Sequence, residues 1–141
     1  MVIIKRDTDY AIRALVQLSR QADTQPVSEL AARERVPEHF LRKIMQRLHR
    51  AGIVESLQGP RGGYKLRRAP RKVTFWHILE AVQGPIEANR CFLDPAICRN
   101  TSDCVVRKKL RPLKDKLQAW LSDITLADVL KRMSIRKGKR S

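Results

Sequence analysis

Three cysteines are the residues of this chain whose type and spacing best suit metal chemistry. Cys91, Cys98 and Cys104 are its only cysteines, with six and five residues between them. An odd number of thiols argues against a closed set of disulfides. Three thiolates in one segment suit a soft metal centre, for which zinc and iron–sulfur are the candidates. Three incidental cysteines would not be expected to fall within fourteen residues.

The segment around these thiols is expected to form a loop rather than regular structure. Pro95 and several Asn, Asp and Ser residues argue against a helix or strand there. Positively charged residues flank it and would favour thiolates over thiols. They are Arg90, Arg99, Arg107 and Lys108. Zinc sites commonly use closely spaced cysteine pairs, which this segment lacks, so zinc is the less favoured candidate.

The elements that would position such a site are centred on residues 27–64, which predict a helix, a turn, a second helix and a two-stranded wing. The second helix has the sharpest pattern, between Pro37 in its first turn and Gly52 as its C-terminal stop. Its apolar residues recur at three, four and three residues, with two more beside them. They are Leu41, Ile44, Leu48 and Ala51, widened by Phe40 and Met45. The opposite face is polar and basic: His39, Arg42, Lys43, Gln46, Arg47 and Arg50.

The first helix of this unit is expected to begin at a capping Ser28, and the turn at residues 33–36 is short. After Gly52 the residues suit two strands, with a turn rich in Gly and Pro between them. The strand residues are Ile53, Val54 and Leu57, then Tyr64 and Leu66. The turn also carries Arg61, so a recognition helix is followed by a hairpin with a basic tip.

Composition indicates one domain that binds a polyanion. The 141 residues include 30 Lys and Arg against 14 Asp and Glu, a net charge of +16. Residues 33–72 hold twelve basic and three acidic residues. A net charge of +9 therefore lies on the helix-turn-helix and the segment that follows it. Such a bias is typical of nucleic-acid binding. Few aromatic residues are available to stack single-stranded bases, which favours duplex DNA.

No apolar run is long enough for a membrane span, and the first ten residues do not resemble a secretory signal. We therefore expect a cytoplasmic protein, in which thiols stay reduced.

The remaining helices complete the expected plan. A first helix should span residues 8–21, capped by Asp7, Thr8 or Asp9, and Thr74 should cap a short helix reaching Val82. A long helix is expected after the cysteines, with a heptad-like apolar pattern interrupted by Pro112, which should kink the helix or mark its regular start. The pattern comprises Val106, Leu110, Leu113, Leu117, Trp120 and Ile124. Thr125 should cap a final short helix, and the basic tail after Met133 should be mobile.

The stretch GPRGGYKL after VPEHFLRKIMQRLHRAGIV, followed by a three-cysteine loop, resembles the Rrf-type family of winged helix-turn-helix transcriptional regulators. The resemblance runs from about residue 8 to about residue 130. It implies a mainly α fold with a small β-hairpin wing and a long dimerisation helix. The implied division is 1–84 for DNA binding, 85–105 for the cysteine loop, 106–133 for dimerisation and C-terminal helices, and 134–141 for the tail.

By this resemblance the three cysteines would bind an iron–sulfur cluster, 4Fe-4S or 2Fe-2S. Arg107 stands where the iron–sulfur assembly regulators of the family place a histidine, and arginine cannot replace that ligand. The stretch DTDYAIRAL resembles the start of the nitric-oxide-sensing repressors, in which an aspartate of the opposite subunit completes a four-iron cluster. Asp9 matches that position; its alternative role is a helix cap. Asp94 and Asp103 are local alternatives for the fourth ligand.

The predicted function is a homodimeric, non-enzymatic repressor that reads duplex DNA and senses nitric oxide, redox state or iron–sulfur status. The predicted DNA-binding residues are Ser28, Glu38, His39, Arg42, Lys43, Arg47 and Arg61. One alternative is a regulator of cluster assembly or iron homeostasis. Another is a zinc-stabilised or RNA-binding basic module. A redox enzyme or electron carrier is disfavoured, because no nucleotide loop or Ser/His/Asp set is present.

Overall fold

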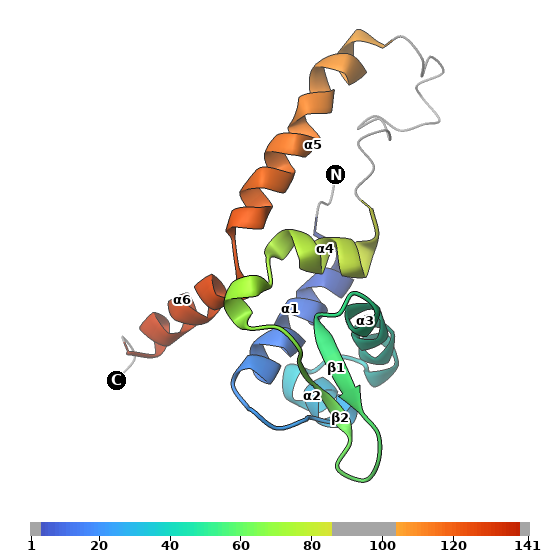
Figure 1. Cartoon of the computed structure of the whole chain (residues 1–141), viewed down its shortest axis with the longest axis vertical. Coiled ribbons are helices and arrows are strands. Elements are labelled where there is room, and N and C mark those ends of the chain that lie inside the picture. The colour runs from blue at the N-terminus through green and yellow to red at the C-terminus, as the bar shows by residue number, and fades with distance from the viewer. Residues whose placement is uncertain (1–3, 86–103, 139–141) are drawn as a thin grey trace.

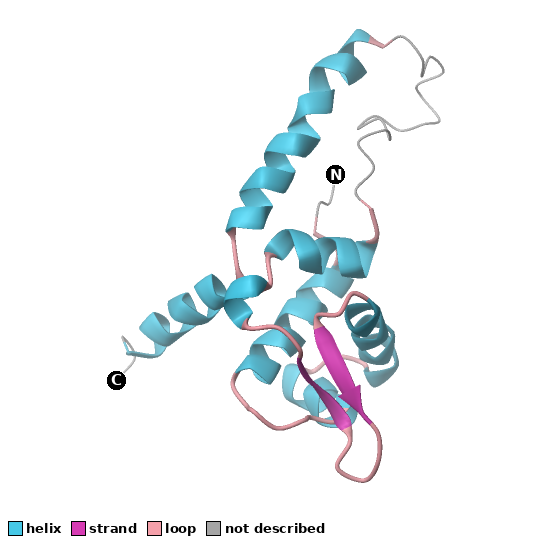
Figure 2. Cartoon of the chain, in the orientation of Figure 1, coloured by secondary structure: helices cyan, strands magenta, loops and turns pink. Residues whose placement is uncertain are grey.

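Four helices and a hairpin form the body of the protein, and two further helices, α5 (Val105–Asp123) and α6 (Leu126–Gly138), extend from it in different directions (Figure 1). The computed structural model describes residues 4–85 and 104–138. Its elements in chain order are α1 (Arg6–Ser19), α2 (Val27–Glu34), α3 (Glu38–Arg50), β1 (Val54–Leu57), β2 (Gly63–Leu66), the 3₁₀ helix η1 (Pro70–Lys72), α4 (Phe75–Gln83), α5 (Val105–Asp123) and α6 (Leu126–Gly138). The predicted mainly helical class with a small β-hairpin is confirmed (Figure 2). None of the described helices is both long enough and apolar enough to cross a membrane.

One core joins α1 to α4 with the wing and the first residue of α6. The apolar periodicity of each helix fills it, and on α3 the buried residues are Leu41, Ile44, Met45 and Leu48. These four confirm the predicted inner face. The prediction that Ala51 and Phe40 face inward is wrong. Ala51 is exposed, and the Phe40 side chain is 47% exposed. Phe40 lies about 100° around the helix from Leu41, so it falls outside the narrow buried stripe.

Two predicted helix caps are wrong. α1 begins after Lys5, two residues earlier than expected, and α2 begins after the extended Pro26 rather than after Ser28. The hydroxyl of Thr8 is instead buried and donates a hydrogen bond to Gln83 Oε1 at 2.5 Å. Thr8 was predicted as a possible helix cap, but its hydroxyl instead joins α1 to α4.

The turn between α2 and α3 closes without glycine. Arg35 takes the left-handed conformation at φ 54° and ψ 44°, and the Val36 amide donates to the Ala31 carbonyl at 2.9 Å. A left-handed Arg costs on the order of 1 kcal/mol, offset here by burial of Val36. The two helices are thus held at a fixed angle, as a helix-turn-helix requires.

The wing is an antiparallel pair in which Val54 lies opposite Leu66 and Leu57 opposite Gly63. It is fastened to the body by Gln25, whose backbone exchanges two 2.9 Å hydrogen bonds with Tyr64. Gly63 permits this close approach, because a Cβ there would lie 2.3 Å from the Gln25 carbonyl oxygen. The wing therefore has a fixed position beside α1 and α2.

α5 runs continuously through Pro112, and its C-terminal end meets the body (Figure 1). There Leu121 packs against Trp76 and Leu79 of α4. Thr74 caps α4 as predicted, accepting a bond from the His77 amide.

The predicted cap at the start of α6 is also confirmed. The Thr125 amide donates to Asp128 Oδ2 at 2.9 Å, and the Asp128 amide donates to Thr125 Oγ1 at 3.3 Å. α6 then continues to Gly138, so residues expected in a mobile tail are helical.

Candidate nucleic-acid interface and metal ligands

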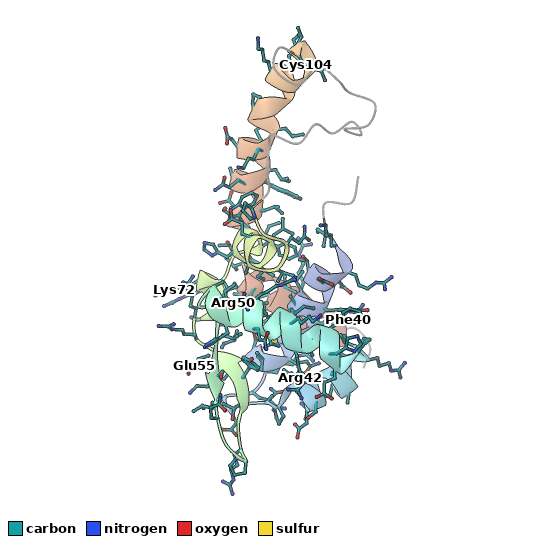
Figure 3. All side chains as sticks on the ribbon, turned by 90° about the vertical axis from the view of Figure 1, so that its right-hand side faces the viewer. Phe40, Arg42, Arg50, Glu55, Lys72 and Cys104 are labelled. Carbon is teal, nitrogen blue, oxygen red and sulfur yellow. The ribbon has the colours of Figure 1, made fainter. Side chains whose placement is uncertain are left out.

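The exposed face of α3 is the main basic surface of the body. Figure 3 looks onto this helix, with Phe40 and Arg42 toward its N-terminal end and Arg50 at its C-terminal end. The predicted polar face is confirmed as exposed. Its residues are His39, Arg42, Lys43, Gln46, Arg47 and Arg50. Because the opposite face is locked into the core, these side chains are presented from a rigid support.

Arg42 and Glu38 form an ion pair one turn apart on this face. The Arg42 guanidinium contacts Glu38 Oε1, and the two side chains are 60% and 43% exposed. Such a pair contributes at most about 1 kcal/mol in water. Arg42 is thereby held along the helix, yet a guanine edge or a phosphate could replace Glu38 at little cost.

Two aromatic rings lie beside this pair at the N-terminal end of α3. The centroids of His39 and Phe40 are 4.2 Å apart, with the rings tilted by 37°. An exposed Phe in this position can contact the methyl group of thymine. Phe40 is the functional candidate that the sequence pattern missed. The sequence did contain a signal for this: Phe40 directly precedes the buried Leu41, so it lies about 100° around the helix from the buried face.

Arg47 differs from the other cations of α3, because its guanidinium turns toward the body. It donates to the Val82 carbonyl oxygen at 2.9 Å and lies 3.5 Å from Asp7 Oδ2. Next to it, Gln83 Oε1 accepts bonds from the Thr8 hydroxyl and from the Lys5 amide. The recognition helix, the start of α1 and the end of α4 therefore meet in one junction. The DNA-contacting role of Arg47 stays a prediction.

The remaining predicted DNA-binding residues lie on α2 and the wing. Ser28 is exposed in the first turn of α2, and Arg61 is exposed at the wing tip. The Thr24 hydroxyl donates to the Arg61 carbonyl at 2.9 Å, which ties the tip to the body. Gly62 makes the tip possible, because a Cβ there would lie 2.4 Å from the Leu57 carbonyl oxygen. Arg61 is thus carried on a constrained loop.

Of the predicted metal ligands, two lie within the described residues. Cys104 is half-buried and is the N-cap residue of α5. Asp9 lies in the first turn of α1 and pairs with Arg13 at 3.0 Å. Its alternative role as the cap is wrong, since Lys5 occupies that position.

The other predicted ligands, Cys91, Cys98, Asp94 and Asp103, lie outside the described residues. Within residues 4–85 and 104–138, no three His, Cys, Asp or Glu side chains gather closely enough to hold a metal ion. Asp9 lies at the end of α1 that is bonded to Gln83, and the cysteine segment begins shortly after Gln83 in the chain. Asp9 is therefore the residue after Thr8, which bonds to the end of α4, while its own carboxylate pairs with Arg13.

Comparison with known proteins gives a consistent family. The family model Rrf2, described as an iron-dependent transcriptional regulator, matches residues 4–132. A protein of Aquifex aeolicus (strain VF5), named among the HTH-type transcriptional regulators, is 35% identical over 124 residues, 86% of each chain. The HTH-type transcriptional regulator IscR of Escherichia coli O1:K1 / APEC is 27% identical over 128 residues, 89% of this chain and 78% of that protein.

Solved structures share the fold. CymR, the global cysteine regulator of B. subtilis, superposes with a TM-score of 0.73 at 22% identity, covering 94% of this chain and 98% of that one. T. potens IscR gives a TM-score of 0.69 at 24% identity, covering 92% and 87%. One fold thus serves regulators with different names, so the signal has to be argued from the residues of this chain.

Proposed function

The chain belongs to the Rrf2 family of transcriptional regulators, and we propose that it is a homodimeric repressor that senses nitric oxide, redox state or iron–sulfur status. The observation that carries this proposal is the exposed basic face of α3, which lies on a helix whose other face is fixed in the core. The junction at the end of α4 belongs to the same body, and Cys91 follows Gln83 by eight residues in the sequence. The relatives are DNA-binding regulators and not enzymes, which agrees with the absence of catalytic motifs in the sequence.

DNA reading is assigned to the N-terminal end of α3. There Arg42, Lys43 and His39 would reach base edges and phosphates of the major groove, and Phe40 adds an apolar contact to a thymine methyl. Glu38 holds Arg42 before binding and would accept from a cytosine amine or release Arg42 to guanine. Arg61 on the wing would reach the adjacent backbone or groove, while Ser28 contacts a phosphate.

Dimerisation is assigned to α5. Val106, Leu113 and Trp120 recur every seven residues and are 52%, 44% and 64% exposed. A stripe of this period suits a second helix packed along it. The partner copy would place a second α3 about one turn of duplex, roughly 34 Å, from the first. A two-fold symmetric operator follows from this arrangement.

The donor set of the chain fits an iron–sulfur cluster. Cys91, Cys98 and Cys104 would supply three thiolates, and Asp9 of the partner copy is the proposed fourth ligand. A carboxylate is a harder and weaker ligand for iron than a thiolate, so one iron would stay accessible. When bound, a cluster supplies a centre that reacts with nitric oxide or oxidants.

The junction around Arg47 supports a route from the cysteine segment to the DNA. The segment begins just after α4, whose end is bonded to Arg47 of α3 and through Gln83 to the start of α1. It ends at Cys104, the cap of α5. A change in the segment would therefore act on the angle of α3 and on the dimer helix together. Both determine the separation of the two recognition helices.

The test combines spectroscopy with DNA binding. Protein purified anaerobically is analysed for iron, sulfide and zinc, and its absorbance spectrum is recorded. Cys91→Ser, Cys98→Ser and Cys104→Ser are each expected to abolish the cluster. Asp9→Asn should leave it assembled but more easily lost or altered in its response to nitric oxide. Asp23→Asn, an exposed carboxylate of the α1–α2 loop, is the matched control.

Several outcomes would overturn parts of this proposal. Stoichiometric zinc without iron would exclude the cluster. Spectra and nitric oxide responses of Asp9→Asn equal to those of Asp23→Asn would exclude the fourth ligand. Failure of the cluster-loaded protein to bind any duplex selected from genomic fragments would exclude the DNA-reading role.

A further inference from the structure

A second basic surface follows the wing and is outside the predicted DNA-binding set. It consists of Arg67, Arg68, Arg71 and Lys72, together with Arg50 at the end of α3, and is called here the basic flank. All five side chains are exposed. Nothing in the core or in the wing requires these charges, because the neighbouring apolar residues already provide the packing. Their function must therefore be sought on the surface.

The flank adjoins the C-terminal end of α3. Gly52 follows that helix, and its Cβ position would lie 3.6 Å from Arg68 and 3.8 Å from Arg67. The Arg67 amide donates to the Ile53 carbonyl at 3.0 Å, which fixes the segment there. Figure 3 shows Lys72 beyond Arg50, at the end of α3 opposite Phe40 and Arg42. The flank therefore extends the face on which the recognition helix is presented.

The charges of the flank have no acidic partners among the described residues. The ion pairs of that part of the chain join Arg13, Arg42, Arg47 and Lys65 to neighbouring carboxylates, and no flank residue is among them. Glu80 lines the same surface hollow as Arg68 without coming within ion-pair distance. Two of the cations of α3 are thus partly neutralised in the free protein, whereas the flank keeps its full charge for an external anion.

The segment is also held in place before any ligand arrives. η1 forms one tight turn, with the Lys72 amide donating to the Ala69 carbonyl at 2.8 Å. The buried Val73 then accepts a 2.8 Å bond from the Leu126 amide of α6. Arg71 and Lys72 therefore project from an anchored backbone, so less conformational entropy is lost when they bind an anion.

We infer that the basic flank binds the phosphates of duplex DNA outside the bases read by α3, and so lengthens each half-site. The inference rests on the proposed DNA-reading role of α3. From Arg42 to Arg50 the helix advances about 12 Å, which is about the width of the major groove. If Arg42 contacts the base edges, the C-terminal end of α3 and the adjoining flank would lie against the phosphate backbone at the edge of the groove. Contacts of this kind set affinity and register and carry no base preference.

The experiment compares two triple variants of the full-length protein. Arg68→Gln, Arg71→Gln and Lys72→Gln are combined in the flank variant. Arg20→Gln, Lys109→Gln and Lys116→Gln, exposed cations that belong neither to α3 nor to the flank, are combined in the control with the same formal charge. Each is bound to the operator, to random duplex and to an operator trimmed by about one helical turn on both sides. Sedimentation checks that both variants keep the oligomeric state of the wild type.

The flank variant is expected to lose affinity by the same factor on the operator and on random duplex. Its slope of log affinity against log salt should fall by up to about 0.9 for each phosphate that the protein no longer neutralises. Wild type should bind the trimmed operator less tightly, and the flank variant should not distinguish the two lengths. If the flank variant matches the control while wild type binds its operator, this inference fails alone. If wild type binds no duplex, the proposed function fails with it.

Discussion

The body of the protein and the helix α5 differ in how far their apolar side chains are buried. In the body, α1 to α4 and the wing cover one another, and residues such as Leu15, Leu41 and Leu48 are fully buried. On α5, Trp120 and Val106 are more than half exposed within a single chain. The apolar residues of the body are therefore covered within one chain, whereas the apolar stripe of α5 is left exposed.

The boundary between the two regions lies inside α5. Leu121 is buried against Trp76 and Leu79, but Trp120, its immediate neighbour, is 64% exposed. The helix therefore has one face fixed to the body and another turned away from it. Anything that packs on the second face is connected rigidly to α4, and through Val82 to Arg47 on the recognition helix.

The largest expected effect is on the body. Leu48→Ala removes a fully buried side chain and should lower the free energy of unfolding by about 2–5 kcal/mol. Phe40→Ala, on the same helix but exposed, should change it by no more than about 0.5 kcal/mol. Urea denaturation measures both. Similar losses for the two variants would contradict the assignment of the buried face of α3.

A charge on the exposed stripe should affect association more than folding. Trp120→Glu is expected to weaken the dimer by about 100-fold or more, because it would bury an unpaired carboxylate between two helices. Gln118→Glu adds the same charge at another exposed position of α5 and is the control. Analytical ultracentrifugation measures both. Unchanged dimerisation of Trp120→Glu would show that another surface joins the two copies.

Much of the body could be predicted from the sequence because its signals are local. The three- and four-residue spacing of Leu41, Ile44 and Leu48 predicted the buried face of α3, and the glycines of residues 59–63 predicted the wing. The same spacing on α5 predicted a helix and an apolar stripe. The spacing alone did not predict which residues of α5 would face α4.

What the sequence could not show are contacts between distant parts of the chain. Arg47 was placed on the DNA-facing side from its helical position, and that role stays a prediction, but its bond to the Val82 carbonyl joins residues 35 apart. Thr8 resembled a cap, yet its partner Gln83 is 75 residues away. Helical periodicity contains no information on such pairs, because they depend on how α1, α3 and α4 pack. The junction of α1, α3 and α4 could therefore not be predicted from the sequence.

The two arginines of α3 provide a finer test of this junction. Arg42→Gln should reduce discrimination for the operator over random duplex by about 1–3 kcal/mol. It should lower the free energy of unfolding by no more than about 0.5 kcal/mol, because the ion pair with Glu38 is exposed. Arg47→Gln should instead lower the free energy of unfolding by about 0.5–1.5 kcal/mol, because the Val82 carbonyl loses a donor. Parallel denaturation and DNA-binding titrations separate the two. Equal effects of both variants on discrimination would instead support the predicted DNA-contacting role of Arg47.

The smallest expected effect is at the end of α5, where Asp128 closes the cap that starts α6. The pKa of its carboxyl lies below the ordinary value of 3.8, chiefly because the Thr125 amide donates to it, then because of the Thr125 hydroxyl, with Lys131 and Arg132 adding attraction. Since the folded state lowers this pKa, the contribution to stability is present above the unfolded pKa. It is lost as pH falls through the folded value.

Asp128→Asn should therefore lower the melting temperature by a constant amount from neutral pH down to about pH 5, and the difference should shrink below about pH 4. Asp123→Asn, an exposed carboxylate near the C-terminal end of α5 and outside the Thr125–Asp128 cap, is the matched control and should show little difference at any pH. Because Leu126 at the start of α6 is buried in the body core, loss of this cap should appear in the main unfolding transition. A separate early transition confined to helix content would instead place α6 outside the body and move the boundary between the two regions to Ile124.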